Sequence, residues 1–110
     1  MRRRSVAVMS KSHGAKSYLV ECYWPGINDA TVAAAAQRAL RAASELRRQG
    51  HEIRFLGAIL VPDDETVFCL FDGHKADVVA ASQLAAVPFE RVLESRRIDG
   101  NHVTERRCRF

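Results

Sequence analysis

The chain has 110 residues, of which 47% are hydrophobic and 27% are charged. This length supports one domain, and this composition excludes disordered, collagen-like and disulfide-stapled proteins. The formal net charge of +4 divides into +4 for residues 1–14, −1 for residues 15–98 and +1 for residues 99–110. Because the basic residues concentrate at the two ends and are not interleaved with aromatic residues, we expect no nucleic-acid partner.

We expect a basic, disordered N-terminal tail at residues 1–14, a folded domain at residues 15–98 and a C-terminal tail at residues 99–110. The apolar segment SVAVM after the first arginines has five residues, whereas a signal peptide needs roughly 7 to 15. No apolar run approaches the roughly 20 residues of a membrane span. The three cysteines form no CxxC motif, so a reducing, cytoplasmic setting without a membrane partner is predicted.

The first half of the domain predicts a strand followed by a long helix. Residues 17–24, SYLVECYW, are rich in β-forming side chains and are followed by a Pro-Gly pair that stops the strand. Asn28 is placed to cap a helix, because apolar residues recur at spacings of three and four through residues 32–46. Gly50 is placed to end this helix in a left-handed conformation.

The second half predicts a hairpin, a helix and a final strand. Residues 53–61, IRFLGAILV, form one strand, and residues 66–72, TVFCLFD, return as its partner. A second helix spans residues 74–86 and ends before Pro88, and residues 89–98 form an edge strand. The order β-α-β-β-α-β predicts an α+β, ferredoxin-like sandwich, in which a four-stranded antiparallel sheet carries both helices on one face.

The hairpin strands are apolar on both faces, although helices would cover only one face of this sheet. A lone domain would leave four large side chains in water: Leu56, Leu60, Phe68 and Leu70. Soluble monomers rarely expose such a patch, and burial of apolar surface contributes about 25 cal/mol per Å². We therefore predict that the partner of the chain is a second copy of itself, in a homodimer that forms through the sheet face.

The chain contains no serine-nucleophile motif, phosphate-binding loop or HExxH motif, so no catalytic residue is predicted. Cys22 and Cys69 lie in apolar strands that we expect to be neighbours, and we interpret both as core residues. Cys108 falls in the C-terminal tail. Glu21 interrupts the first strand on the face away from the helices, where a carboxylate needs a positive partner. The candidate partners are Arg54, Arg91 and Arg96.

The stretch FCLFDGHKAD at residues 68–77 leads directly from an apolar strand to a histidine. If the hairpin closes around residues 62–65, Ile53 lies opposite His74 and Phe55 lies opposite Asp72.

This register brings His51 and Glu52 close to His74 at one rim of the sheet. Imidazole and carboxylate groups are ligands that nickel, zinc and copper accept. The candidate metal ligands are His51, Glu52, Asp72, His74 and Asp77. The alternative is that His74 only begins the second helix.

Three segments carry a resemblance to a known family: YLVECYWPG at residues 18–26, LGAILVPDDETVFCLFDG at residues 56–73 and VPFERVLE at residues 87–94. Together with the alanine-rich helix, they resemble the small bacterial nickel-binding family of ferredoxin-like dimers, catalogued as a domain of unknown function. The resemblance covers residues 17–98, and Glu21 matches the strand glutamate of the family. It implies a homodimeric, cytoplasmic protein that holds nickel or another divalent metal.

The leading hypothesis is a small, non-enzymatic, dimeric binding protein that binds or sequesters nickel or another divalent metal. One alternative is a dimeric α+β-barrel enzyme that encloses a small hydrophobic molecule, on which Glu21 or Tyr23 would act. A second alternative is a structural or regulatory module that docks a partner through arginines of the first helix: Arg38, Arg41 and Arg48.

Overall fold

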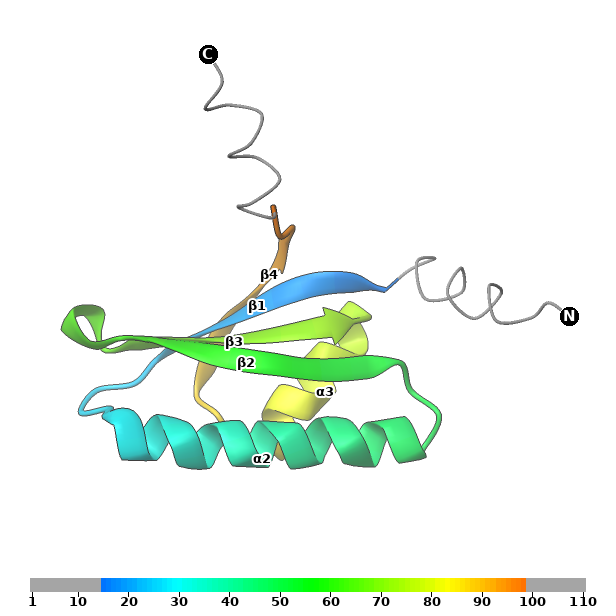
Figure 1. Cartoon of the computed structure of the whole chain (residues 1–110), viewed down its shortest axis with the longest axis horizontal. Helices are drawn as coiled ribbons and strands as arrows, with labels where there is room; N and C mark the ends of the chain where they lie inside the picture. Colours follow the sequence, from blue (N-terminus) through cyan, green and yellow to red (C-terminus); the bar gives the residue numbers. More distant parts are fainter. Residues whose placement is uncertain (1–14, 99–110) are drawn as a thin grey trace, which may run out of the picture.

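The computed structural model describes residues 15–98. The tails predicted at residues 1–14 and 99–110, with Cys108, lie outside the described residues. The elements are β1 (Lys16–Tyr23), α2 (Asp29–Arg48), β2 (Ile53–Val61), the 3-10 turn η1 (Pro62–Asp64), β3 (Thr66–Gly73), α3 (Lys75–Leu84) and β4 (Phe89–Ser95). The strands form a 4-stranded antiparallel sheet in the order β2-β3-β1-β4. Both helices lie on one side of this sheet (Figure 1), so the predicted ferredoxin-like fold is confirmed.

Helix α2 begins and ends at the residues that the sequence predicts. Asn28 caps it, because its side-chain oxygen accepts a hydrogen bond from the backbone N–H of Thr31 at 2.9 Å. Gly50 follows the helix with a φ of 96° and donates its N–H to the carbonyl of Arg47 at 2.9 Å. The buried side of α2 is made mostly of alanines, which let the helix pack closely against β2 and α3.

The core lies between the helices and the sheet. Strands β1 and β3 alternate, so every second side chain of each points toward the helices. The largest fully buried side chains are Val20, Cys22, Val67, Cys69, Phe71 and Val78, with Ser82 as a polar member. Both cysteines are buried and free, so the prediction that Cys22 and Cys69 are core residues is confirmed.

The β2–β3 hairpin contains a β-bulge that the sequence analysis did not predict. The predicted pairing holds for residues 57–61 against residues 66–70. Leu56 is then an extra residue without a partner, and Gly57 beside it has a φ of 145°. A bulge of this kind shifts the register of everything that precedes it by one residue.

Two predicted pairs are therefore wrong: Ile53 lies opposite Gly73 instead of His74, and Phe55 lies opposite Phe71 instead of Asp72. The shift also puts Arg54 opposite Asp72. Since side chains alternate between the faces of a sheet, Arg54 and Asp72 share the face that the helices do not cover.

That uncovered surface, called the open face below, is largely apolar. Leu19, Phe68, Leu70 and Leu93 are half-buried on it, and Ile59 and Leu56 are 51% and 39% exposed. The prediction of apolar side chains on this face is confirmed for Leu56, Phe68 and Leu70. It is wrong for Leu60, which lies opposite the buried Val67 and packs against the core.

Candidate functional site

The predicted metal ligands lie where β2 begins and where β3 passes into α3. Because Gly50 ends helix α2, His51 and Glu52 form the short link to the first residue of β2. The backbone N–H of His51 also bonds to the carbonyl of Leu46 at 3.0 Å, which fixes this link against the helix. His74 is the N-cap residue of α3 and makes no side-chain capping bond, so its imidazole is available for other contacts.

Four of these residues form two histidine–carboxylate pairs, and we call this group the rim: His51, Glu52, His74 and Asp77. His51 Nδ1 lies 3.0 Å from Asp77 Oδ1, and His74 Nε2 lies 3.4 Å from Glu52 Oε1. The prediction that His51 and Glu52 come close to the start of α3 is confirmed. Within residues 15–98, however, no three His, Cys, Asp or Glu side chains converge on one point that suits a metal ion.

Asp72, the fifth predicted ligand, is engaged elsewhere. Its Oδ1 accepts a hydrogen bond from the hydroxyl of Ser17 at 2.6 Å. Ser17 and Asp72 are register partners on the open face, where the bulge in β2 places Arg54 beside them. The five predicted residues are therefore divided into two rim pairs and one carboxylate on the sheet surface.

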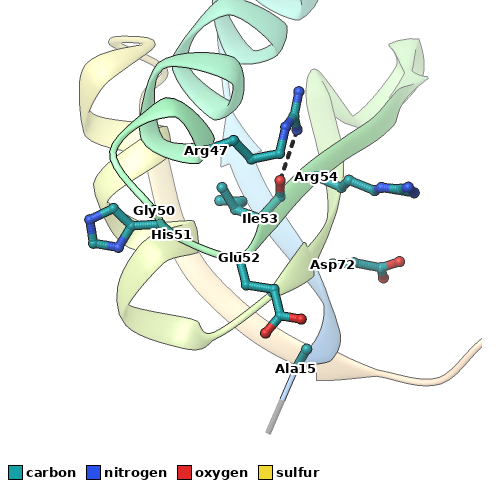
Figure 2. A pocket seen from close by; sticks show the side chains of 9 residues that line it. Ala15, Arg47, Gly50, His51, Glu52, Ile53, Arg54 and Asp72 are labelled. Carbon is teal, nitrogen blue, oxygen red and sulfur yellow. Dashed lines mark hydrogen bonds between the residues drawn. The ribbon is translucent and has the colours of Figure 1, made fainter. Parts of the chain in front are cut away.

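A pocket of about 400 Å³ joins these two places. Glu52, Arg54 and Asp72 line it, and so does His51, although its imidazole points away from Arg54 and Asp72 (Figure 2). Arg47 closes its upper end by donating from its guanidinium to the carbonyl of Ile53 at 2.8 Å. The sequence analysis did not single out Arg47, and it considered Arg54 only as a possible partner of Glu21, because neither arginine belongs to a recognisable ligand motif.

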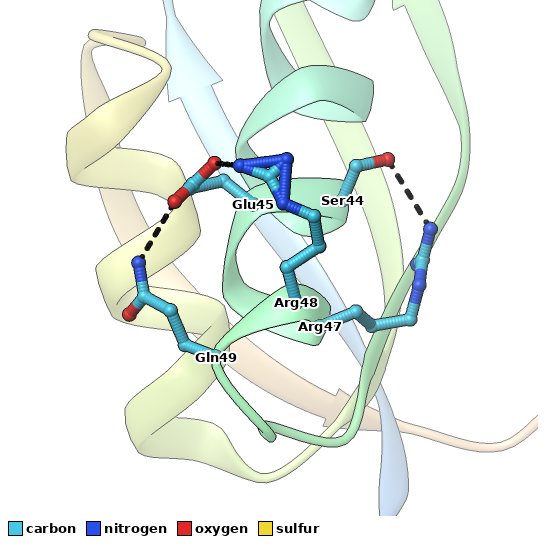
Figure 3. A network of polar contacts seen from close by, with 5 residues as sticks. All are labelled: Ser44, Glu45, Arg47, Arg48 and Gln49. Carbon is cyan, nitrogen blue, oxygen red and sulfur yellow. Dashed lines mark hydrogen bonds and ion pairs between the residues drawn. The ribbon is translucent and has the colours of Figure 1, made fainter.

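The last turns of α2 carry a polar network of their own (Figure 3). Glu45 accepts hydrogen bonds from Arg48 and from the amide of Gln49, the second at 3.0 Å, while Arg47 donates to the hydroxyl of Ser44 at 3.2 Å. Arg38, on the same helix, donates from Nε to the carbonyl of Ala85 at 2.7 Å. Two of the three arginines that were predicted to dock a partner are thus engaged within the chain.

Glu21 lies on the open face and pairs with Arg91 of β4. Arg91 Nε donates to Glu21 Oε1 at 2.7 Å, and the Glu21 side chain is 26% exposed. This hydrogen bond and the attraction of the carboxylate raise the pKa of the Arg91 guanidinium. The predicted ion pair of Glu21 is confirmed, and Arg91 is the partner among the three candidates.

The family model described as nickel responsive protein SCO4226-like matches residues 18–94. The chain belongs to this family. The crystal structure of SCO4226 from Streptomyces coelicolor A3(2) has a TM-score of 0.63 with 19% sequence identity, over 76% of this chain and 99% of that one. None of the curated proteins compared with the chain matches it.

The SCO4226-like segment includes all four rim residues, Asp72 and the Glu21–Arg91 pair. The family model confirms the family that the sequence analysis identified by resemblance. The crystal structure of SCO4226 confirms the predicted fold. Among the helices of residues 15–98, none has the length and apolarity that a membrane crossing requires.

Proposed function

We propose that this chain is a non-enzymatic, dimeric protein that binds or sequesters nickel or another divalent metal ion at the rim. The description of its family as nickel responsive supports this proposal. So does the chemistry of the rim, because imidazole and carboxylate are ligands that nickel, zinc and copper share.

The separation of the paired atoms is the observation that carries the proposal. Two ligand atoms at about 2.1 Å from one ion lie about 3.0 Å apart in octahedral geometry and about 3.4 Å apart in tetrahedral geometry. The His51–Asp77 pair has a separation of 3.0 Å, and the His74–Glu52 pair has a separation of 3.4 Å. Each pair therefore has a separation that two ligands of one ion adopt, and the same separation makes a direct histidine–carboxylate contact when no ion is bound.

Each pair supplies two ligands, so water or a second chain completes the coordination. The histidines of the two pairs are 44% and 45% exposed, which leaves room for those further ligands. Asp72, which lines the adjacent pocket together with Glu52, is the fifth proposed ligand, and binding an ion would replace its hydrogen bond with Ser17. The proposed ligands are His51, Glu52, Asp72, His74 and Asp77.

Calorimetry with nickel chloride tests the metal site on protein that carries no affinity tag. We expect the unmodified chain to bind nickel, and the His51→Ala/His74→Ala double variant to bind at least about tenfold more weakly, because each half-site loses its nitrogen ligand. The matched control is His13→Ala/His102→Ala, which removes two histidines outside the described residues and leaves the affinity unchanged. Absence of binding by the unmodified chain, or equal binding by the rim variant, contradicts the proposal.

The proposed dimer rests on the open face. Its half-buried Leu19, Phe68, Leu70 and Leu93 form an apolar surface on the face away from the helices, and stacking against the same surface of a second copy would bury it. A partner on this face would also bury the Glu21–Arg91 ion pair. Because these two charges neutralise each other, the contact would contain no unpaired charge at this position.

Light scattering at micromolar concentration tests the dimer. We expect twice the mass of one chain, and the mass of one chain for Phe68→Glu, because that variant puts a charge in the centre of the contact. Leu40 on α2 is 47% exposed, so Leu40→Glu places the same charge on the helix side and should remain dimeric. A single-chain mass for the unmodified protein refutes the dimer without affecting the metal site.

A further inference from the structure

The pocket of about 400 Å³ beside the rim, called the rim pocket below, has the size of a small-molecule site. Such sites have volumes of roughly 300 to 1,000 Å³, which is more room than an ion and its ligand atoms need. Arg47 and Gly50 line the rim pocket from the end of α2, and Arg54 lines it from the start of β2. It therefore lies at the end of the sheet, beside the edge strand β2, and its lining includes none of the apolar residues of the proposed dimer contact.

The lining carries charges of both signs in separate places. In Figure 2 the guanidinium groups of Arg47 and Arg54 lie in the upper part of the view, and the carboxylates of Glu52 and Asp72 lie below them. Arg54 and Asp72 are register partners, but none of the ion pairs within residues 15–98 joins them. The carboxylates would repel a simple anion, and the guanidinium groups would repel a simple cation. The lining therefore suits a ligand in which a positive centre carries negative groups.

Arg47 is fixed in a position where it can bind a negative group. Its guanidinium donates to the carbonyl of Ile53 at 2.8 Å and to the hydroxyl of Ser44 at 3.2 Å. These two bonds use two of the five N–H donors of the group, whose planar fork matches a carboxylate. Arg54 brings a second guanidinium to the same pocket from the neighbouring strand. Two arginines from different layers of the fold thus supply donors for carboxylates.

Glu52 connects the rim pocket to one of the two metal-binding pairs. It lines the pocket, and its Oε1 lies 3.4 Å from His74 Nε2. An ion held by this pair would therefore border the pocket. The pair supplies two ligands, so other molecules fill the remaining positions of a four- to six-coordinate ion. The second pair differs, because the imidazole of His51 points away from Arg54 and Asp72 (Figure 2).

We propose that the rim pocket takes up nickel together with a small polycarboxylate that chelates it, an inference that rests on the proposed metal-binding function. The ion lies at His74 and Glu52. The chelator occupies the pocket and pairs its outer carboxylates with Arg47 and Arg54. A metal–polycarboxylate complex has the positive centre and the negative periphery that the lining requires. It also supplies the ligands that the pair lacks.

Equilibrium dialysis of radiolabelled citrate tests this proposal on the full chain without an affinity tag. Citrate is a polycarboxylate that chelates nickel through its hydroxyl and carboxylate groups. Tricarballylate is the matched molecule, because it has the same three carboxylates without the hydroxyl. We expect the protein to retain at least about tenfold more citrate with equimolar nickel than without it, since the ion joins citrate to the protein. Nickel should increase the retention of tricarballylate far less.

Variants identify the groups that hold the chelator. Arg54→Gln should lower the nickel-dependent retention of citrate at least about fivefold, because a carboxylate loses its guanidinium partner. Arg54→Lys keeps the charge without the planar fork and should retain an intermediate amount. His74→Ala should abolish the effect of nickel on citrate. Arg41→Gln is the control, because it removes the same charge from an exposed position of α2 and should retain citrate as the unmodified chain does.

Three results would each overturn the proposal: equal retention of citrate with and without nickel, an equal gain for tricarballylate, or equal retention by Arg54→Gln and Arg41→Gln. Light scattering on each variant verifies that a changed oligomeric state does not cause the difference. None of the three results affects the binding of nickel alone, which calorimetry measures in citrate-free buffer. Absence of that binding would instead refute the proposed function, so the two failures are distinguishable.

Discussion

Gly73 lies against Glu52 so closely that a Cβ atom on the glycine would stand 2.7 Å from the carbonyl oxygen of Glu52. The same atom would lie 3.2 Å from the Cα of Ile53. Both obstacles are backbone atoms, which cannot rotate away as the end of a side chain would. The close approach of β3 to the start of β2, on which the rim depends, therefore requires glycine at this position.

We expect Gly73→Ala to lower the free energy of unfolding by about 2 to 3 kcal/mol, from steric overlap added to backbone strain. Gly57→Ala is the matched control: its φ of 145° is close to the 152° of Gly73, but a Cβ there meets nothing within 4 Å. It should cost only about 1 kcal/mol. Urea unfolding of both variants at one protein concentration measures the difference, and equal losses would show that crowding at Gly73 is unimportant.

Ala86 follows helix α3 with a φ of 56°, a left-handed conformation in which a side chain is strained. Ala86→Gly should therefore raise the free energy of unfolding by about 0.5 to 1 kcal/mol, since relief of strain exceeds the added chain entropy. The same substitution at the exposed, helical Ala76 should lower it by about 1 kcal/mol. Thermal and urea unfolding should agree on the opposite signs, and a loss of stability in Ala86→Gly would contradict the argument.

Arg38 of α2 donates a hydrogen bond to the carbonyl of Ala85, at the end of α3. The last carbonyls of a helix have no partner within the helix, so this bond both satisfies the Ala85 carbonyl and connects the two helices. Arg38→Ala should cost about 1 to 2 kcal/mol in unfolding free energy, because this half-buried carbonyl loses a charged donor. Arg41 is exposed on the same helix, and Arg41→Ala should change stability by less than about 0.5 kcal/mol. Indistinguishable urea midpoints for the two variants would refute this role of Arg38.

Cys22 and Cys69 are 0% and 2% exposed. The neighbouring Cys69 thiol and burial raise the pKa of the Cys22 thiol. Access therefore limits the reaction of both thiols. In a Cys108→Ser background, a thiol-specific reagent should label neither cysteine of the native protein within minutes and both cysteines in denaturant. Rapid labelling under native conditions would show that the core opens.

The sequence by itself determined the order of elements, the ends of α2 and the apolar character of the sheet. These properties are local: Asn28 caps and Gly50 stops a helix through contacts within a few residues, and alternation in β1 and β3 follows from the pleat of a strand. The pairing of Glu52 with His74 was also predictable, since both residues stand next to strands that must be neighbours.

Only the tertiary structure decided the register at the start of β2, because a bulge depends on how both strands pack. The presence of Gly57 in the sequence does not by itself predict a bulge. That single extra residue, Leu56, moves Asp72 opposite Arg54 instead of Phe55. It thereby gives Asp72 an arginine neighbour on the open face and leaves Leu56 exposed there. Side chains alternate between the two faces along a strand, so one inserted residue changes which side chains are neighbours at that end of the sheet.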